Sequence, residues 1–296
     1  MVNNLRNFTK SESIIELPVE AYEDICGSKM YYEISGNPNG EWLVLIHGMS
    51  GSTKCWKYQL KDFNKHFKVL NIDLLGHGNS NERKSGKYSG PIMANYIRIL
   101  MDKLEIDKAH ILGLSLGSIV EQYFSQMFPE KIISLIFASP VTKPNYVSTI
   151  SNFLSEKVLL KIFSKNTYLN IMGKLMLPGK AHKKSREFFI RETLKMSDQE
   201  FHKWFRIALD GDHYYYLTES NIPTLIVVGD KDFCYFKDAL ALKDKYLNSK
   251  LNVIQDAGHV FIFQKAEEFN HMVIEHINAL QVATVAATEE NTTIAA

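Results

Sequence analysis

The sequence predicts an α/β protein with a mostly parallel central sheet flanked by helices. Short apolar runs alternate with helical stretches along most of the 296-residue chain. Runs without polar alternation are typical of strands that are buried on both faces of a parallel sheet. Strands that alternate with helices form right-handed βαβ units, so we expect a doubly wound sheet. The predicted strands of this sheet are 42–48, 68–74, 109–115, 132–139, 223–229 and 250–258.

The N-terminal part differs from this pattern. Residues 1–15 are polar and show no period, which predicts an arm without regular structure. Residues 19–35 contain two β-prone segments that are interrupted by Cys-Gly-Ser at 26–28. Such an interruption is typical of a turn between strands. We therefore expect an antiparallel hairpin at one edge of the sheet.

Helices are predicted where apolar residues recur at helical spacing. One such stretch surrounds residues 119–127 and ends before Pro129, and the last one surrounds residues 269–280. Between about residues 140 and 220 the strand pattern stops, and amphipathic helical stretches are separated by breakers such as Pro178-Gly179. This segment is expected to form a lid.

These patterns predict a division of the chain. We expect a core formed by residues 1–142 and 218–282, and a helical lid formed by residues 143–217. The tail, residues 283–296, has small and polar residues and no amphipathic face, which predicts disorder.

The composition is that of a soluble globular protein, with 45% hydrophobic and 23% charged residues. A formal net charge of +1 gives no field that would indicate nucleic acid or an anionic membrane as the main partner. Cys26, Cys55 and Cys234 are too few and too scattered for a disulfide framework, and they lack zinc-site spacing. The sequence has no signal-peptide core and no apolar run long enough to span a membrane. We therefore expect a cytoplasmic protein.

The predicted lid is rich in basic residues. Residues 143–212 contain thirteen lysines and arginines against seven aspartates and glutamates, a net charge of +6. A solvated helical surface is one interpretation of this excess. A patch that attracts an anionic substrate or an anionic carrier protein is the other.

A nucleophile is predicted at Ser115. It lies in the sequence GLSLG at 113–117, directly after a predicted strand and at the start of a predicted helix, which is the context of a nucleophile elbow. Such a turn strains the serine backbone, and the two glycines remove Cβ atoms that would clash. The helix N-terminus directs N–H groups and a partial positive charge towards the serine. A helix-capping serine without chemical function is the alternative.

A serine hydroxyl needs a base, and the base needs a group that orients it. Of the ten histidines, His259 follows the last predicted strand by a short loop, which places it at the same sheet edge as Ser115. The orienting acid is expected after another strand, between the serine and the histidine along the chain. Asp232 meets this condition. The nearby Asp230 is interpreted as a turn residue whose side chain bonds its own backbone.

Attack on a carbonyl puts negative charge on its oxygen, which requires hydrogen-bond donors. The candidates are the backbone N–H groups of Leu116 and of Met49, the latter in the loop after the first parallel strand. Gly48 and Gly51 would let this loop approach the serine closely. His47 is expected to hold the loop by hydrogen bonds.

Together, these motifs resemble the α/β-hydrolase superfamily, and within it the lidded branch of esterases, lactonases, thioesterases and carbon–carbon bond hydrolases. The resemblance covers about residues 19–142 and 218–280. It rests on HG at 47–48, GLSLG at 113–117, GDKD at 229–232 and GH at 258–259, in the order Ser, Asp, His. The resemblance implies an α/β-hydrolase fold and a lid that roofs the substrate pocket. The segment from Asp73 to Ser80 resembles the family's DxxGxGxS loop and is expected to shape the sheet edge.

The leading functional hypothesis is a serine hydrolase that cleaves an ester or a thioester of a small-molecule substrate through an acyl-enzyme at Ser115. This chemistry needs no metal and no cofactor. The alternatives that keep the same residues are an acyltransferase, a lactonase and a carbon–carbon bond hydrolase. A further alternative is a non-catalytic protein that binds a small molecule on the hydrolase fold.

Overall fold

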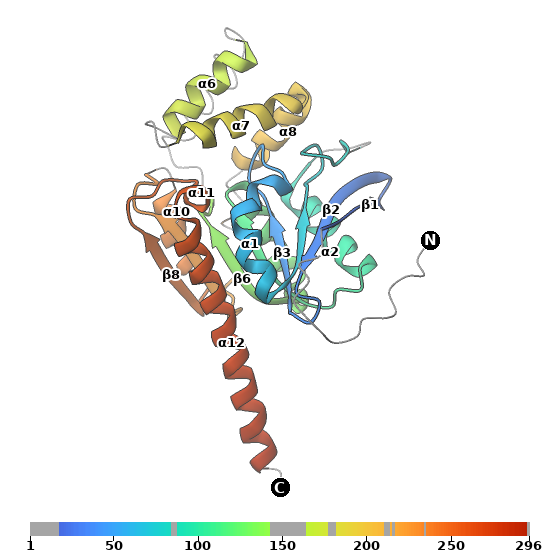
Figure 1. Ribbon diagram of the computed structural model, residues 1–296, viewed down its shortest axis with the longest axis vertical. Helices are drawn as coiled ribbons and strands as arrows, with labels where there is room; N and C mark the ends of the chain where they lie inside the picture. Colours follow the sequence, from blue (N-terminus) through green and yellow to red (C-terminus); the bar gives the residue numbers. More distant parts are fainter. Residues whose placement is uncertain are drawn as a thin grey trace.

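A central sheet with helices on both faces and a group of helices at one end forms the molecule (Figure 1). The computed structural model describes residues 18–83, 88–142, 164–176, 182–209, 214, 217–233 and 235–294. The predicted arm at residues 1–15 lies outside these ranges.

The sheet has eight strands in the order β1-β2-β4-β3-β5-β6-β7-β8. The strands are β1 (Val19–Ile25), β2 (Ser28–Gly36), β3 (Trp42–Ile46), β4 (Lys68–Ile72), β5 (Ala109–Leu114), β6 (Ile132–Ala138), β7 (Thr224–Gly229) and β8 (Ser249–Ile254). β2 pairs in antiparallel fashion with both β1 and β4, and the other neighbours are parallel. The predicted mostly parallel sheet and its antiparallel edge hairpin are confirmed.

The edge hairpin shows why the Cys-Gly-Ser segment turns. Ile25 pairs directly with Ser28, so only Cys26 and Gly27 form the loop. Both have positive φ, 52° and 79°, as a two-residue type I′ turn requires. The Asp24 carboxylate accepts a hydrogen bond of 2.8 Å from the Gly27 N–H, which supports the turn.

Helices cover the two faces of the sheet, and each face has its own apolar core. The helices are α1 (Lys57–His66), α2 (Gly90–Lys103), α3 (Leu116–Met127), α6 (Lys165–Met176), α7 (Lys183–Lys195), α8 (Asp198–Leu209), α10 (Phe236–Lys243), α11 (Phe261–Gln264) and α12 (Ala266–Ile294), with 3₁₀ turns η1 (Thr53–Trp56) and η2 (Pro129–Lys131). In β3, Val44 and Ile46 face the core beneath α2, α3 and α10, whereas Leu43 and Leu45 face the core beneath α1, α11 and α12. This alternation explains why the strand sequences are apolar throughout.

The segment predicted as a lid contains helices α6, α7 and α8, which Figure 1 shows grouped at the end of the molecule opposite the C-terminus. They share a small apolar cluster formed by Tyr168, Leu169 and Phe201. Residues 143–163 and 177–181, including the Pro178-Gly179 breaker, lie outside the described residues. The described part of the predicted lid is therefore helical, and its boundaries at 143 and 217 stay predictions.

The predicted disorder of the tail differs from the structure. α12 continues to Ile294 as one 29-residue helix, so residues 283–294 are helical. Figure 1 shows this last part of α12 projecting beyond the sheet. Residues 281–294 contain neither glycine nor proline, the two residues that are least favourable in a helix interior. Among the described residues, no helix is both long enough and apolar enough to cross a membrane.

Candidate active site

Ser115 lies in a tight turn between β5 and α3, with φ 52° and ψ −115°. This is a strained backbone conformation for a residue with a side chain. A Cβ atom added at Gly117 would lie 2.3 Å from the carbonyl oxygen of Ile46, and one added at Gly113 would lie 2.3 Å from the Glu121 carboxyl group. Only glycine fits on either side of the serine, as the sequence predicted.

His259 lies in the loop between β8 and α11, with its side chain largely buried. Its Nε2 is 2.8 Å from the Ser115 Oγ, and its Nδ1 is 2.7 Å from Oδ2 of Asp232. Because a carboxylate only accepts hydrogen bonds, the proton of the neutral ring lies on Nδ1, and Nε2 can accept the serine O–H. The structure thus brings the three predicted side chains into one hydrogen-bonded chain, and their catalytic role stays a prediction.

Asp232 is positioned by the loop that follows β7. Its N–H donates to the carbonyl oxygen of Gly229 at 3.1 Å, which closes a turn directly after the strand. The neighbouring Asp230 accepts a hydrogen bond of 3.0 Å from the Ala257 N–H. The interpretation of Asp230 as bonding its own backbone is therefore wrong. Its carboxylate instead ties the loop of Asp232 to the loop that carries His259.

The loop after β3 lies against the nucleophile. A Cβ atom added at Gly48 would lie 3.2 Å from the Cβ of Ser115. The Gly51 N–H donates to the Gly48 oxygen at 2.9 Å, and Ser50 has φ 59°, which together define a tight turn. We call Gly48–Gly51 the oxyanion turn. Its Met49 N–H, with the N–H of Leu116 at the start of α3, stays the predicted oxyanion hole.

His47 holds this turn, in agreement with expectation. Its Nδ1–H donates to the Gly48 oxygen at 2.8 Å, and its Nε2 accepts from the Leu74 N–H at 3.0 Å. Complete burial lowers the pKa of His47 to about 4, so the ring is neutral near pH 7. A neutral ring is what this pairing of one donor and one acceptor requires.

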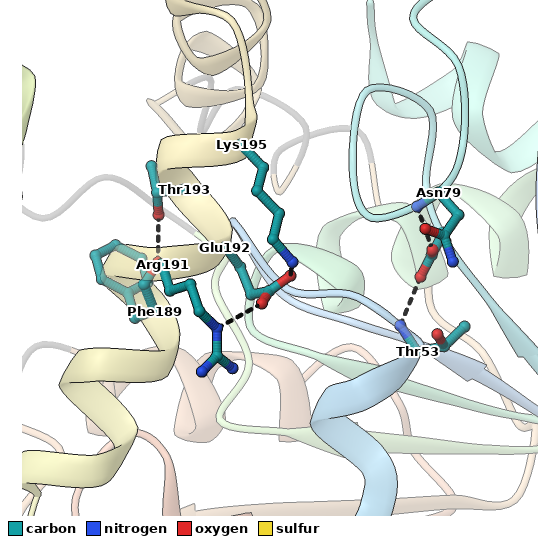
Figure 2. A network of polar contacts seen from close by, with 8 residues as sticks. Thr53, Asn79, Phe189, Arg191, Glu192, Thr193 and Lys195 are labelled. Atoms are coloured by element: carbon teal, nitrogen blue, oxygen red, sulfur yellow. Dashed lines mark hydrogen bonds and ion pairs between the residues drawn. The ribbon is translucent and has the colours of Figure 1, made fainter.

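The segment from Asp73 to Ser80 shapes the sheet edge, as expected from the resemblance. Oδ1 of Asp73 accepts from the Thr53 N–H at 2.5 Å, and Oδ2 accepts from the Asn79 N–H at 2.7 Å. The contacts at Thr53 and Asn79 are visible in Figure 2. The Ser80 hydroxyl donates to the Asp73 carbonyl oxygen at 2.6 Å. Burial raises the pKa of Asp73 to about 6.

In the described part of the predicted lid, basic side chains form ion pairs with carboxylates of the same segment. Figure 2 shows the buried carboxylate of Glu192 between Arg191 and Lys195. Its Oε1 lies 3.1 Å from Nε of Arg191, and its Oε2 lies 2.6 Å from Nζ of Lys195. Burial favours the neutral acid, but hydrogen bonds from both cations lower the pKa of Glu192 below its ordinary value. Further pairs join Lys165 to Asp198, Lys183 to Glu187 and Lys203 to Glu200. The predicted anionic partner of the lid therefore gains no support from these residues.

Three supporting residues were not predicted from the sequence. The Ser139 hydroxyl donates to the carbonyl oxygen of His259 at 2.7 Å, and the Tyr235 ring centre lies 4.6 Å from the His259 ring centre. Behind the elbow, the buried Glu121 accepts from the Ile136 N–H at 3.1 Å. Ser139 ends a predicted strand at the sheet edge of Ser115 and His259, so its sequence position could have indicated a place near the site. The sequence around Tyr235 and Glu121 gives no such indication. Among the described residues, no group of three or more His, Cys, Asp or Glu side chains is arranged to hold a metal ion.

Comparisons with known proteins agree with this architecture. The sequence profile described as "alpha/beta hydrolase fold" matches residues 41–166. The chain is 23% identical to an uncharacterized carboxylesterase of Bacillus subtilis, over 94% of both chains. It is 26% identical to a 2-hydroxy-6-oxononadienedioate/2-hydroxy-6-oxononatrienedioate hydrolase of Pseudomonas putida, over 80% of this chain and 88% of the relative. A crystal structure of a hydrolase from Pseudomonas aeruginosa superimposes with a TM-score of 0.77 at 22% identity, covering 87% of this chain and 98% of the other.

The sheet order, the elbow between β5 and α3, and these similarities lead to one assignment. The chain has the α/β-hydrolase fold, and its residues 41–166 match the family model of that fold.

Proposed function

We propose that the protein is a serine hydrolase that cleaves a carboxylic ester or thioester through an acyl-enzyme at Ser115. The observation that carries the proposal is the hydrogen-bonded chain from the Ser115 hydroxyl through His259 to Asp232, with contacts of 2.8 and 2.7 Å. Each atom in this chain has the donor or acceptor role that nucleophilic catalysis by serine requires.

Acylation follows from these contacts. Oγ of Ser115 attacks the substrate carbonyl carbon while its proton passes to Nε2 of His259, and Asp232 stabilises the resulting imidazolium. The former carbonyl oxygen becomes negative and is held by the N–H groups of Met49 and Leu116. The carbon–oxygen or carbon–sulfur bond then breaks, and the imidazolium gives its proton to the leaving alcohol or thiol.

Deacylation repeats the sequence with water. Nε2 of His259 accepts a proton from a water molecule that attacks the acyl carbon, and the second tetrahedral intermediate collapses. The carboxylic acid leaves and the proton returns to Oγ of Ser115. The two protein atoms that exchange this proton, Oγ of Ser115 and Nε2 of His259, are 2.8 Å apart, which is within hydrogen-bond reach.

The described lid supports an uncharged acyl group over an anionic one. Near the oxyanion turn the lid is apolar, because Tyr168, Leu169 and Phe201 form a cluster against which Met49 packs. In α7, by contrast, the basic side chains of Lys183, Arg191 and Lys195 pair with carboxylates. A small-molecule ester with an apolar acyl part is therefore the substrate class we propose.

A hydrolysis screen tests the proposal. Wild type and Ser115→Ala are compared on p-nitrophenyl esters of increasing chain length, on lactones and on acyl thioesters. We expect wild type to hydrolyse at least one ester class and Ser115→Ala to lose at least about 10³-fold in kcat. Ser249→Ala, at the opposite end of the sheet, is the matched control and should keep its activity. Equal activity in wild type and Ser115→Ala would contradict the proposal.

Carbon–carbon bond hydrolysis is the second candidate, because one relative of the chain carries that activity in its name. Acyltransferases and lactonases would use the same three residues. Product analysis separates these activities: a new ester in the presence of added alcohol indicates acyl transfer, and turnover of a 2-hydroxy-6-oxo dienoate alone indicates carbon–carbon cleavage. A binding protein without turnover would leave every substrate in the screen unchanged.

A further inference from the structure

The direction of the Met49 N–H depends on the two peptide groups beside Met49. The Gly48 oxygen, which lies on the same peptide group as the Met49 N–H, accepts from Nδ1–H of His47 at 2.8 Å. The next peptide group is held through the Ser50 N–H, which donates to Nε2 of His77 at 3.1 Å. In a trans peptide the N–H points opposite to the C=O, so these two contacts fix where the Met49 N–H points.

His77 has to be neutral and in one tautomer to make this contact. Its Nε2 accepts from Ser50, so the ring proton lies on Nδ1, which is 3.3 Å from the Leu75 oxygen. Complete burial, with the neighbouring His47 ring, holds the pKa of His77 well below its ordinary value. The ring centres of the two histidines are 4.9 Å apart.

A lid residue holds His77 in place. Trp204 of α8 is fully buried, and its Nε1–H donates to the Leu75 oxygen at 2.8 Å, the same oxygen that faces Nδ1 of His77. The Trp204 ring packs edge-on against His77, with 5.0 Å between the ring centres. The lid therefore contacts the histidine that supports the oxyanion turn.

The Met49 side chain makes a second link with the lid. It packs against the main core on one side and against the lid cluster of Tyr168, Leu169 and Phe201 on the other. Ser50 has a positive φ, a conformation that persists only where the surroundings hold it. The oxyanion turn is thus held by the core through His47 and by the lid through Trp204 and Met49.

We propose that His77 is a positioning residue that aims the Met49 N–H at the reacting oxygen, and that Trp204 couples the docking of the lid to this alignment. The proposal rests on the proposed function, because it assigns to the oxyanion turn a role in stabilising the intermediate. A displaced α8 would release His77, then Ser50, and the oxyanion hole would lose its alignment. Misplacement of a catalytic group by about 1 Å can cost on the order of 10²-fold in rate.

Three variants test the coupling. His77→Leu removes the acceptor of the Ser50 N–H, His77→Gln restores an acceptor, and Trp204→Phe keeps an aromatic ring but removes the N–H that binds Leu75. The matched controls are Trp42→Phe at the start of β3 and His110→Leu. His110 is also buried, and it bonds Ser134 at 2.8 Å at the far end of the sheet.

The measurements are kcat and KM for p-nitrophenyl butyrate and Ki for an alkyl trifluoromethyl ketone, whose bound oxyanion occupies the oxyanion hole. We expect His77→Leu to lower kcat about 10- to 100-fold with KM changed less than about 2-fold. The Ki for the ketone should rise in parallel with the fall in kcat. His77→Gln should recover part of the loss, and Trp204→Phe should lose about 3- to 10-fold in kcat.

The outcomes separate this inference from the proposed function. Activity that depends on Ser115, with unchanged kcat and ketone Ki in His77→Leu and Trp204→Phe, overturns the inference alone. Equal losses in His110→Leu and His77→Leu also overturn it, because they indicate a general loss of stability. If His77→Leu does not fold, the parallel changes in His77→Gln and Trp204→Phe decide the question. Wild-type activity that persists in Ser115→Ala overturns the proposed function instead.

Discussion

Gly117→Ala is a one-carbon change that tests how the elbow is built. The added Cβ would lie 2.3 Å from the Ile46 carbonyl oxygen and 2.7 Å from that of His47. Ile46 ends β3 and His47 precedes the oxyanion turn, and both oxygens are backbone atoms, so no flexible side chain can move out of the way. Ordinary contacts of a Cβ begin near 3.4 Å, so α3 and β3 have to separate by the difference.

The close contacts of the added Cβ should lower both the stability and the activity of Gly117→Ala. Overpacking of this kind costs about 1–3 kcal/mol, and each kcal/mol lowers Tm by roughly 2–4 °C in a protein of this size. The shift also moves Ser115, two residues earlier, relative to the oxyanion turn. Displacement of a reacting group by about 1 Å can lower the rate on the order of 10²-fold. We therefore expect a lower Tm by differential scanning calorimetry and a much lower kcat at a temperature where the variant is folded.

Gly173→Ala is the matched control. Gly173 lies within α6, and its nearest neighbours would be 3.8 Å from an added Cβ, which is ordinary contact distance. Alanine in a helix is more stable than glycine by about 0.5–1 kcal/mol, so Tm should stay or rise and kcat should not change. The same kcat in Gly117→Ala and Gly173→Ala would refute the argument that close packing of α3 on β3 positions Ser115.

Three further predictions concern buried carboxyl groups. Asp232→Asn replaces the acceptor of the His259 Nδ1–H by an amide that can also donate, and we expect kcat to fall up to about 10⁴-fold with little change in Tm. Glu121→Gln should keep a Tm close to that of wild type, because burial holds the pKa of Glu121 well above its usual range and favours the neutral acid, and the amide oxygen can still accept from the Ile136 N–H. Glu121→Leu should lose about 1–3 kcal/mol by leaving the Ile136 N–H unpaired. The pKa of Asp73 is raised from 3.8 to about 6, so its contribution to stability is full below pH 4 and is lost as the pH rises through 6. The free energy of unfolding is measured by chemical denaturation for wild type and Asp73→Asn. The amount by which the wild-type value exceeds that of the variant should shrink by on the order of 2–3 kcal/mol from pH 4 to pH 7. A difference that does not change with pH would contradict the raised pKa of Asp73.

The strands and the positions of the central residues could be predicted because their signals are local. A strand that is buried on both faces is apolar at nearly every position, and β3, β5 and β7 are, apart from His110 in β5 and Thr224 in β7. Ser115 follows a strand directly, Asp232 and His259 follow strands by short loops, and the carboxyl ends of parallel strands meet at one sheet edge. The order of the strands then brings these loops together.

The supporting contacts depend on packing between distant parts of the chain, which a single sequence does not reveal. Trp204 reads as one more apolar residue of an amphipathic helix, yet its N–H bonds Leu75, 129 residues earlier. Asp230 follows a strand as turn residues do, but its carboxylate bonds Ala257 on another loop. The sequence of the tail has no amphipathic pattern that would predict a helix, whereas α12 extends to Ile294.

The most direct test of the account identifies the nucleophile by covalent labelling. The protein is treated with a fluorophosphonate, residual esterase activity is followed, and the modified residue is located by peptide mapping. We predict one phosphonyl group per chain, bound to Ser115, with activity lost in proportion to labelling and no label in Ser115→Ala. A label on another residue at full loss of activity, or undiminished labelling of Ser115→Ala, would contradict the account.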